Sequence, residues 1–187
     1  MKLDRIYTRG GDKGQTSLGD GTRVTKYHPR VRAMGGLDEG NAALGVAVIH
    51  TDNATIKKLL ARVQNDLFDV GADLCRPERA DEKKEPLRVT AAQVTALEND
   101  IDRFNEPLRP LTSFVLPGGS PASAHLHLAR AVLRRAECDI TELMTAEPLN
   151  PELLKYVNRL SDLLFVLARY LNAGGENDVL WQPGLNR

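Results

Sequence analysis

The stretch ATIKKLLARVQNDLFDVGADL, residues 54–74, decides the fold. Its apolar residues recur at alternating intervals of four and three, and they are Ile56, Leu60, Val63, Leu67, Val70 and Leu74. This spacing gathers them on one stripe of an α-helix, which is the pattern by which helices pack side by side in a bundle. We therefore predict a helix over residues 54–74 whose apolar stripe faces other helices.

The segments before and after this helix show the same period. Residues 31–50 carry a helical apolar face, although their four glycines weaken an isolated helix. A helix that keeps so many glycines is expected to be buried or closely approached by a neighbour. Residues 90–104 begin with the capping-box pair Thr90 and Gln93. The charged, proline-containing segment 76–88 is expected to be a solvated loop.

Two further helices are indicated by their N-terminal caps. Ser120 followed by Pro121 begins one that runs to about Thr145. The apolar residues expected to supply its core are Leu128, Val132, Leu133, Ile140 and Leu143. Asn150 begins the last helix, which ends near Asn172 before two glycines.

These five helices predict an all-α, up-and-down bundle that forms a single domain over residues 1–187. We expect a glycine-rich N-terminal loop at 1–30, the bundle at 31–175 and a C-terminal tail at 176–187. Extended pieces are expected only near Ile6 and Phe114.

Composition excludes several broad classes. The chain has 25 basic and 25 acidic residues, and this balance disfavours a nucleic-acid or membrane-surface binder. Its two cysteines form no CxxC pair, which indicates free thiols in a reducing compartment. Neither a secretory h-region nor an apolar run of membrane-spanning length is found in the sequence, so a cytoplasmic location is expected.

Residues 8–17, TRGGDKGQTS, predict an anion-binding loop. The donor side chains in and after it are Thr8, Arg9, Lys13, Thr16, Ser17 and Lys26. Gly10, Gly11 and Gly14 allow backbone N–H groups to approach an anion closely. The loop does not spell the Walker A motif, which needs GK[ST] at the start of a helix after a strand. A P-loop NTPase is therefore disfavoured.

The helix expected to begin at Ser120 carries a polar stripe beside its apolar one. Its members recur at intervals of three and four, and they are His127, Arg130, Arg134, Glu137 and Thr141, with Arg135 alongside. Two interpretations stay open. The stripe is either a solvated face on which Arg134 neighbours Glu137, or a polyanion site, because guanidinium groups bind phosphate oxygens in pairs.

Two other helices carry polar residues that are either part of a binding site or ordinary structural and solvated groups. The stripe on the last helix consists of Asn158, Asp162, Phe165 and Arg169. Its polar members need partners if they are buried, and a simple pair between Arg159 and Asp162 is the alternative. On the helix over residues 31–50, Asp38 is either the partner of an arginine on another helix or a solvated acid.

Several catalytic patterns are missing from the sequence. It contains no Glu-x-x-His pair for a di-iron site, no zinc-ligand spacing and no G-x-S-x-G nucleophile elbow. The candidate residues are mainly phosphate binders and polar positioners. That set suits a reaction whose nucleophile is supplied by a cofactor.

Five motifs occur in order along nearly the whole chain. They are YTRGGDKGQTSLGDGTRVTK, LDEGNAALG, FVLPGG, ARAVLRRAE and VNRLSDLLFVLARY. Together they resemble the motifs of the PduO-type ATP:cob(I)alamin adenosyltransferases. The resemblance implies a ferritin-like five-helix bundle with an ordered N-terminal nucleotide-binding loop, assembled as a homotrimer with active sites between subunits. It also implies transfer of the 5′-deoxyadenosyl group of ATP, accompanied by Mg²⁺, to cob(I)alamin, with triphosphate as the second product.

The resemblance implies roles for individual residues. The ATP-binding positions it implies are Thr8, Arg9, Gly10, Gly11, Lys13, Thr16, Ser17, Lys26, Arg134, Arg135, Glu137, Cys138 and Asn158. Asp38 and Arg130 match a catalytic pair that bridges subunits, and Arg134 joins them in catalysis. Phe114 matches an aromatic residue that displaces the lower cobalt ligand, and it contacts cobalamin together with Asp162. Glu137 is the candidate for contact with Mg²⁺ through ATP.

Three positions depart from the usual family pattern. Gly10 stands where threonine is frequent, Cys138 stands where arginine is frequent, and DEGNA with Gly40 replaces DELNS, which could loosen that turn. These departures leave a second hypothesis open, a nucleotide-sensing or cobalamin-carrying module that lacks turnover. The partners implied by the resemblance are a corrinoid reductase and a B12-dependent acceptor enzyme, without nucleic acid or membrane.

Overall fold

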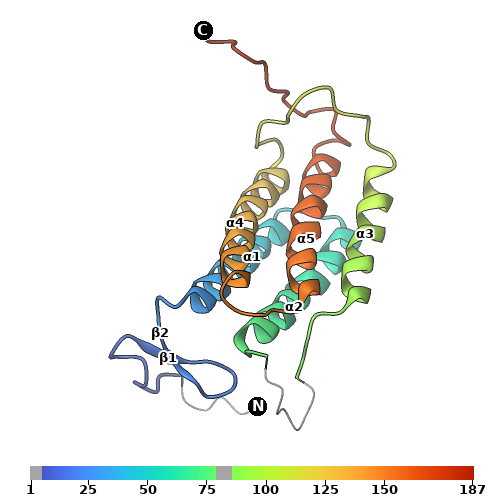
Figure 1. Ribbon diagram of the computed structural model, residues 1–187. Coiled ribbons are helices and arrows are strands. Elements are labelled where there is room, and N and C mark those ends of the chain that lie inside the picture. Colours follow the sequence, from blue (N-terminus) through green and yellow to red (C-terminus); the bar gives the residue numbers. More distant parts are fainter. Residues whose placement is uncertain (1–5, 79–85) are drawn as a thin grey trace.

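The computed structural model describes residues 6–78 and 86–187 and contains five helices in these ranges. They are α1 (Pro29–Ile49), α2 (Ala54–Cys75), α3 (Ala91–Asn105), α4 (Pro121–Met144) and α5 (Pro151–Tyr170). The prediction of a five-helix all-α bundle is therefore confirmed. Helix α1 packs on α2 and α4, and α5 packs on α4 and α3 (Figure 1). Part of the loop expected over 76–88 lies outside the described residues.

The caps expected from the sequence begin their helices. Thr90 and Gln93 form the complete capping box of α3. The Ser120 hydroxyl accepts a hydrogen bond from the Ser123 N–H at the start of α4, and the Asn150 side chain accepts one from Glu152 at the start of α5. Each such cap satisfies an N–H group that the first helical turn leaves unpaired.

The apolar stripe of α4 differs from the expected one. Leu128 was expected in the core, yet it is 55% exposed. The buried stripe is Leu126, Ala129, Leu133, Ala136, Ile140 and Leu143. These residues keep intervals of three and four. The prediction was right for Leu133, Ile140 and Leu143, whereas Val132 is half-buried and only Leu128 is exposed. Alanines at two of these positions leave room for a close neighbour, which the leucine-based interpretation overlooked.

That close neighbour is α1, and its glycines explain the approach. A β-carbon on Gly40 would lie 2.5 Å from Leu133 Cδ2, and one on Gly36 would lie 2.9 Å from the Ala136 β-carbon. The expectation that this glycine-rich helix is closely approached is confirmed. Gly40 therefore permits tight packing of α1 on α4, where the sequence suggested only a loosened turn.

The expectation of no strand in the N-terminal region beyond the Ile6 piece was wrong. Strands β1 (Gln15–Ser17) and β2 (Arg23–Thr25) form an antiparallel hairpin, whereas Ile6 lies outside any strand. Three-residue strands are too short for a period-two pattern to reveal them. A main-chain hydrogen bond of 2.8 Å, donated by Gly19 to the Cys75 carbonyl, ties the hairpin to the end of α2.

Candidate functional site

The predicted anion-binding loop lies on the β1–β2 hairpin at one end of the bundle (Figure 1). Thr8, Arg9 and Lys13 are exposed, as is Lys26 just beyond β2. A β-carbon on Gly11 would lie 3.0 Å from Lys26 Nζ, so this ammonium group sits against the loop. The structure thus gathers the N-terminal candidates, including Thr16 and Ser17 on β1, into one donor-rich surface.

A pocket of about 750 Å³ lies between the segment before α4, the first half of α4 and helix α5. Its walls include Phe114, Arg130 and Asp162, three residues implied by the resemblance. They come from the segment before α4, from α4 and from α5. A large pocket lined by rings and a few polar groups is the usual form of a small-molecule site.

The C-terminal tail holds Phe114 in place. The N–H of Trp181 donates a hydrogen bond of 2.8 Å to the Phe114 carbonyl, and the N–H of Leu116 donates one of 2.8 Å to the Val179 carbonyl. The rings of Phe114 and Trp181 are 5.9 Å apart, and both line the pocket. The extended piece expected near Phe114 is therefore present, as an isolated bridge between Val115 and Leu180.

Buried polar groups fasten this tail to α5. Arg169 Nε donates to Asp178 Oδ2 at 2.8 Å, and Asn172 Nδ2 donates to Asp178 Oδ1 at 3.0 Å. Arg169 and Asn172 are both buried, and the carboxylate satisfies them. Sequence reasoning missed Trp181, although a single tryptophan in a polar tail was a signal that could have drawn attention to it.

Phe165 links the polar stripe of α4 to α5 inside the pocket. The His127 ring meets the Phe165 ring edge-on at 6.1 Å, and the Arg130 guanidinium lies 5.5 Å from the centre of the Phe165 ring. Burial lowers the pKa of His127, and the neighbouring Arg130 charge lowers this pKa further. Burial, followed by repulsion from Arg134, lowers the pKa of the Arg130 guanidinium, while Asp162 opposes this change.

The middle of α4 faces α5 through a polar contact. Asn158 Nδ2 donates to Glu137 Oε1 at 2.8 Å, which joins two implied ATP-binding residues. The alternative pair between Arg159 and Asp162 is not formed, because Arg159 Nε instead donates to Glu98 Oε1 on α3 at 3.0 Å. That geometry leaves Asp162 at the pocket.

The exposed side of α4 holds the remaining implied ATP-binding residues. Arg134 and Cys138 are exposed, and Arg134 makes neither a hydrogen bond nor an ion pair with any described residue. Arg135 is paired with Glu39 of α1. Arg134 is thus free to meet an anion, whereas Arg135 would have to give up a carboxylate first.

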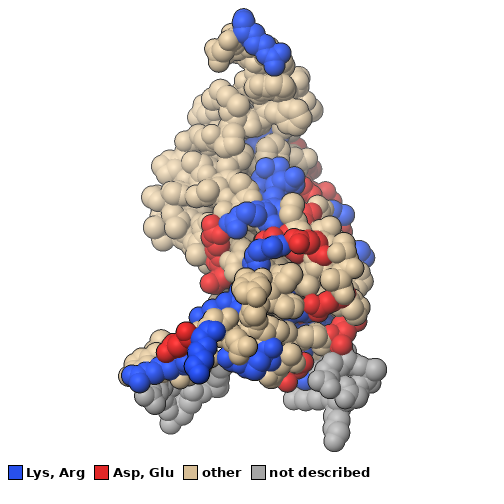
Figure 2. All heavy atoms as spheres, turned by 60° about the vertical axis from the view of Figure 1, so that its left-hand side comes forward, with Lys and Arg blue, Asp and Glu red and all other residues tan. Residues whose placement is uncertain are grey.

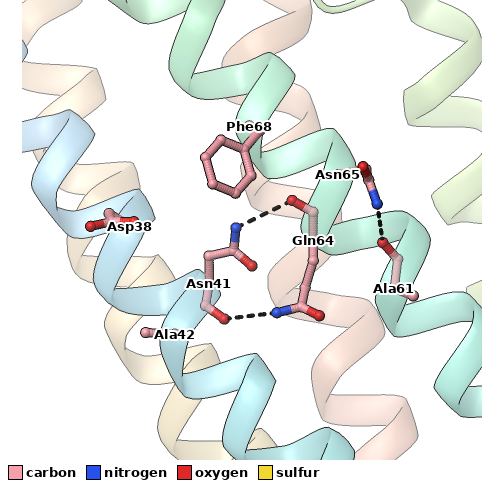
Figure 3. A pocket seen from close by; sticks show the side chains of 7 residues that line it. All are labelled: Asp38, Asn41, Ala42, Ala61, Gln64, Asn65 and Phe68. Carbon is pink, nitrogen blue, oxygen red and sulfur yellow. Dashed lines mark hydrogen bonds between the residues drawn. The ribbon is translucent and has the colours of Figure 1, made fainter. Parts of the chain in front are cut away.

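Asp38 lies apart from the other implied catalytic residues. It is exposed on α1 and lines a pocket of about 440 Å³ with Asn41, Gln64 and Phe68 (Figure 3). Two reciprocal hydrogen bonds, of 3.2 and 3.3 Å, tie Asn41 to Gln64 across α1 and α2. No arginine within the described ranges pairs with Asp38, so one chain does not bring Asp38 and Arg130 together.

A metal site built from protein ligands alone is not found in the part of the chain that the structure describes. Glu137 is engaged with Asn158 and has no second acid within a metal-ligand group there. In the same ranges, none of the helices has the length and apolar character that a membrane span requires.

A comparison with known proteins identifies the family of this chain. A family model described as cobalamin adenosyltransferase matches residues 6–171, which include the hairpin, the segment of Phe114 and helices α1–α5. The chain belongs to the cobalamin adenosyltransferase family. Its relatives place it with the PduO-type members of this family.

Two related proteins are similar in sequence to this chain over most of its length. A corrinoid adenosyltransferase from Mycobacterium tuberculosis (strain H37Rv) is 49% identical over 191 residues, which cover 100% of this chain and 97% of the relative. The corrinoid adenosyltransferase PduO of Salmonella typhimurium is 43% identical over 88% of this chain and 48% of that protein.

Solved structures of this family share the fold. A variant of the PduO-type ATP:corrinoid adenosyltransferase from Lactobacillus reuteri, complexed with cobalamin and ATP, superposes with a TM-score of 0.89 at 35% identity. The match covers 96% of this chain and 97% of that one. A second variant from the same organism, complexed with ATP, gives a TM-score of 0.86 at 36% identity.

Proposed function

We propose that this cobalamin adenosyltransferase family member transfers the 5′-deoxyadenosyl group of ATP to the cobalt of cob(I)alamin. The observation that carries the proposal is the family match over residues 6–171, which spans both the donor-rich hairpin and the ring-lined pocket. Triphosphate leaves as the C5′–O bond breaks and the cobalt–carbon bond forms. The products are adenosylcobalamin and triphosphate.

The side chains suit a reaction in which the protein supplies no nucleophile. Reduced cobalt provides the electron pair that attacks C5′, so the protein has to position the substrates and stabilise the departing charge. A triphosphate that leaves carries several negative charges. Lys26 beside the loop and the unpaired guanidinium of Arg134 are suited to that charge, because fixed cations stabilise developing charge without reorganising.

We assign the pocket to the corrinoid. Phe114, held against Trp181 by main-chain hydrogen bonds, would occupy the lower face of the cobalt and exclude its lower ligand. Loss of that donor ligand lowers the energy of the orbital that accepts the electron, so Co(II) becomes easier to reduce. Asp162 and Arg130 line the same pocket and would contact the corrinoid periphery.

We further propose a homotrimer whose sites lie between subunits. Two observations support such an assembly. Within one chain the hairpin and the segment before α4 lie at opposite ends of the bundle (Figure 1), and Asp38 and Arg130 line different pockets. A second copy could bring an Asp38 to Arg130 and a loop to Arg134, which would complete the site.

An exposed apolar area supports contact between copies. Val46, Ile49 and Leu128 are 40%, 74% and 55% exposed. They lie near one another, because the His50 and His125 rings beside them are stacked 4.9 Å apart across α1 and α4. Figure 2 shows a wide area without charged side chains on one face of the molecule. Contiguous apolar surface of this kind is typical of protein–protein interfaces.

Magnesium, the location and the partner enzymes complete the proposal. Mg²⁺ would be held chiefly by the ATP phosphates, since Glu137 alone offers one carboxylate at that position. The chemistry of a reduced corrinoid suits a cytoplasmic location and a corrinoid reductase that supplies Co(I). A B12-dependent enzyme would accept the product.

One assay tests the proposed reaction. A corrinoid is reduced to Co(I), and ATP, Mg²⁺ and the protein are added under anaerobic conditions. We expect the Co(I) absorbance to fall with equimolar release of triphosphate. Binding of both substrates without turnover would contradict the transferase assignment and would favour a carrier or sensor.

A further inference from the structure

Arg23 on β2 joins two of the implied ATP-binding positions. Its Nη2 donates a hydrogen bond of 2.8 Å to the Gly10 carbonyl, and its Nη1 donates one of 3.1 Å to Ser17 Oγ. Ser17 is also the residue opposite Arg23 in the hairpin register. One guanidinium fork therefore connects the beginning of the loop, thirteen residues away, to strand β1.

The bond to Gly10 sets the direction of the next amide. In a planar trans peptide the C=O and N–H groups point in opposite directions, so holding the Gly10 oxygen orients the N–H of Gly11. This N–H donates to no described residue, and Lys26 Nζ lies next to Gly11. An oriented, unpaired amide beside an ammonium group is a place where an anion oxygen can bind.

The loop backbone needs such a restraint. Arg9 has φ of 59°, a left-handed conformation that a long side chain rarely adopts. When the adjacent residues have right-handed backbone conformations, a residue in this left-handed conformation turns successive N–H groups toward one concave side. The conformation is unfavourable alone, so contacts from outside the loop have to maintain it.

We propose that Arg23 is a positioning residue that holds residues 8–17 in the shape that binds the triphosphate of the nucleotide. The inference rests on the proposed function for the identity of the anion. Arg23 has no carboxylate partner in the described part of the chain, so its charge also adds to the positive field of the loop.

The fork geometry distinguishes this role from a simple charge effect. A guanidinium holds two acceptors at once in a fixed plane, whereas a lysine ammonium cannot reach Gly10 and Ser17 with the same geometry. Arg23→Lys keeps the charge and loses the fork. If positioning matters, Arg23→Lys should behave like Arg23→Ala.

The test is titration calorimetry of the full-length protein with Mg-ATP and, separately, with inorganic tripolyphosphate. We expect Arg23→Ala and Arg23→Lys each to raise Kd for both probes by about tenfold, the range expected when a charge-assisted hydrogen bond is lost. In the turnover assay KM for ATP should rise equally, while KM for the corrinoid stays unchanged. Guanidinium ion at low millimolar concentration should partly restore the affinity of Arg23→Ala.

Two matched variants serve as controls. Thr22→Ala removes the Thr22 hydroxyl donation to Asp20 in the hairpin turn and leaves Gly10 untouched. Arg103→Lys changes an exposed arginine on α3, far along the chain from the hairpin. Both should leave Kd for ATP within about twofold of the wild type.

The possible results separate this inference from the proposed reaction. Wild-type affinity in Arg23→Lys, or an equal loss in Thr22→Ala, would overturn the positioning role even if turnover is normal. A wild type that binds ATP and tripolyphosphate but transfers no adenosyl group would overturn the reaction alone. In that case the Kd values of the variants still decide the role of Arg23.

Discussion

The hairpin and the Phe114 pocket, to which we assign the triphosphate and the corrinoid, are built in opposite ways. The hairpin region is largely exposed, is built from three-residue strands and offers backbone N–H groups beside exposed cations. The pocket is lined by the exposed rings of Phe114 and Trp181 and by the buried His127, and its tail is fixed by the buried pair Arg169–Asp178. A triphosphate needs many hydrogen-bond donors, and binding it can order the loop that carries them. A corrinoid ring needs a pocket whose shape is already formed.

The comparison predicts that charge dominates one region and shape the other. Substitutions near the hairpin or the exposed face of α4 should therefore alter nucleotide use with little loss of stability. Substitutions in the pocket should alter corrinoid use.

Arg134→Ala should give the largest loss. An unpaired, exposed guanidinium contributes little to folding, but one that faces a departing triphosphate could contribute ~3–4 kcal/mol, a fall in turnover of about 10²–10³-fold. The measurement is kcat with Co(I)alamin beside a thermal melt. Wild-type turnover, or a loss matched by unfolding, would show that the α4 stripe is merely a solvated face.

Phe114→Ala should separate the two regions. It should leave Kd for ATP unchanged, because the pocket that Phe114 lines contains none of the implied ATP-binding residues. It should reduce turnover of Co(II) substrate in a coupled reducing assay by about 100-fold. Trp181→Phe, which keeps a ring against Phe114, is the matched control and should retain most of this turnover. Equal rates from Co(II) in Phe114→Ala and the wild type would refute ligand displacement.

Asp38→Asn should weaken the assembly and the site together. If Asp38 meets Arg130 of another subunit, removing its charge should cost about 2 kcal/mol, a factor of about 30 in the association constant. Analytical ultracentrifugation over a dilution series, run alongside turnover, measures both effects. Glu39→Gln is the control, since Glu39 already pairs with Arg135 of its own chain. A fully assembled and active Asp38→Asn would identify Asp38 as a solvated acid.

His127→Gln should change the pH dependence of stability. Burial and Arg130 lower the folded-state pKa of His127 below its ordinary value of 6.5, and Asp178 opposes this only weakly. Below about pH 6.5 the unfolded chain therefore binds a proton that the folded chain resists, so wild-type stability falls as pH falls toward the lowered pKa. The slope is at most about 1.4 kcal/mol per pH unit for one proton.

Urea denaturation at pH 7.0, 6.0 and 5.0 measures this slope. His127→Gln should lose less stability than the wild type between pH 7 and 5, and the two should differ least in slope above pH 7. His125→Gln is the control, because His125 is partly exposed and stacks on His50 outside the pocket. Parallel curves for His127→Gln and the wild type would place His127 in a solvated environment.

The sequence determined the helices and their caps, because apolar periodicity and capping are local properties. The seam of Ile56 and Leu60, the box at Thr90 and the cap at Ser120 all lie within a turn or two of the residues they order. The donor-rich loop and the guanidinium stripe were likewise visible as composition and spacing. Their assignment to ATP came from the resemblance of motifs.

The contacts between residues far apart in the chain follow only from the tertiary structure. Leu128 faces outward because Gly36 and Gly40 bring α1 against the side of α4 that carries Ala136 and Leu133. Trp181 meets Phe114 only because Arg169 and Asp178 hold the tail on α5. Arg23 reaches Gly10 only through the hairpin turn. Local pattern carries no information about such contacts, because each depends on how whole elements pack in three dimensions.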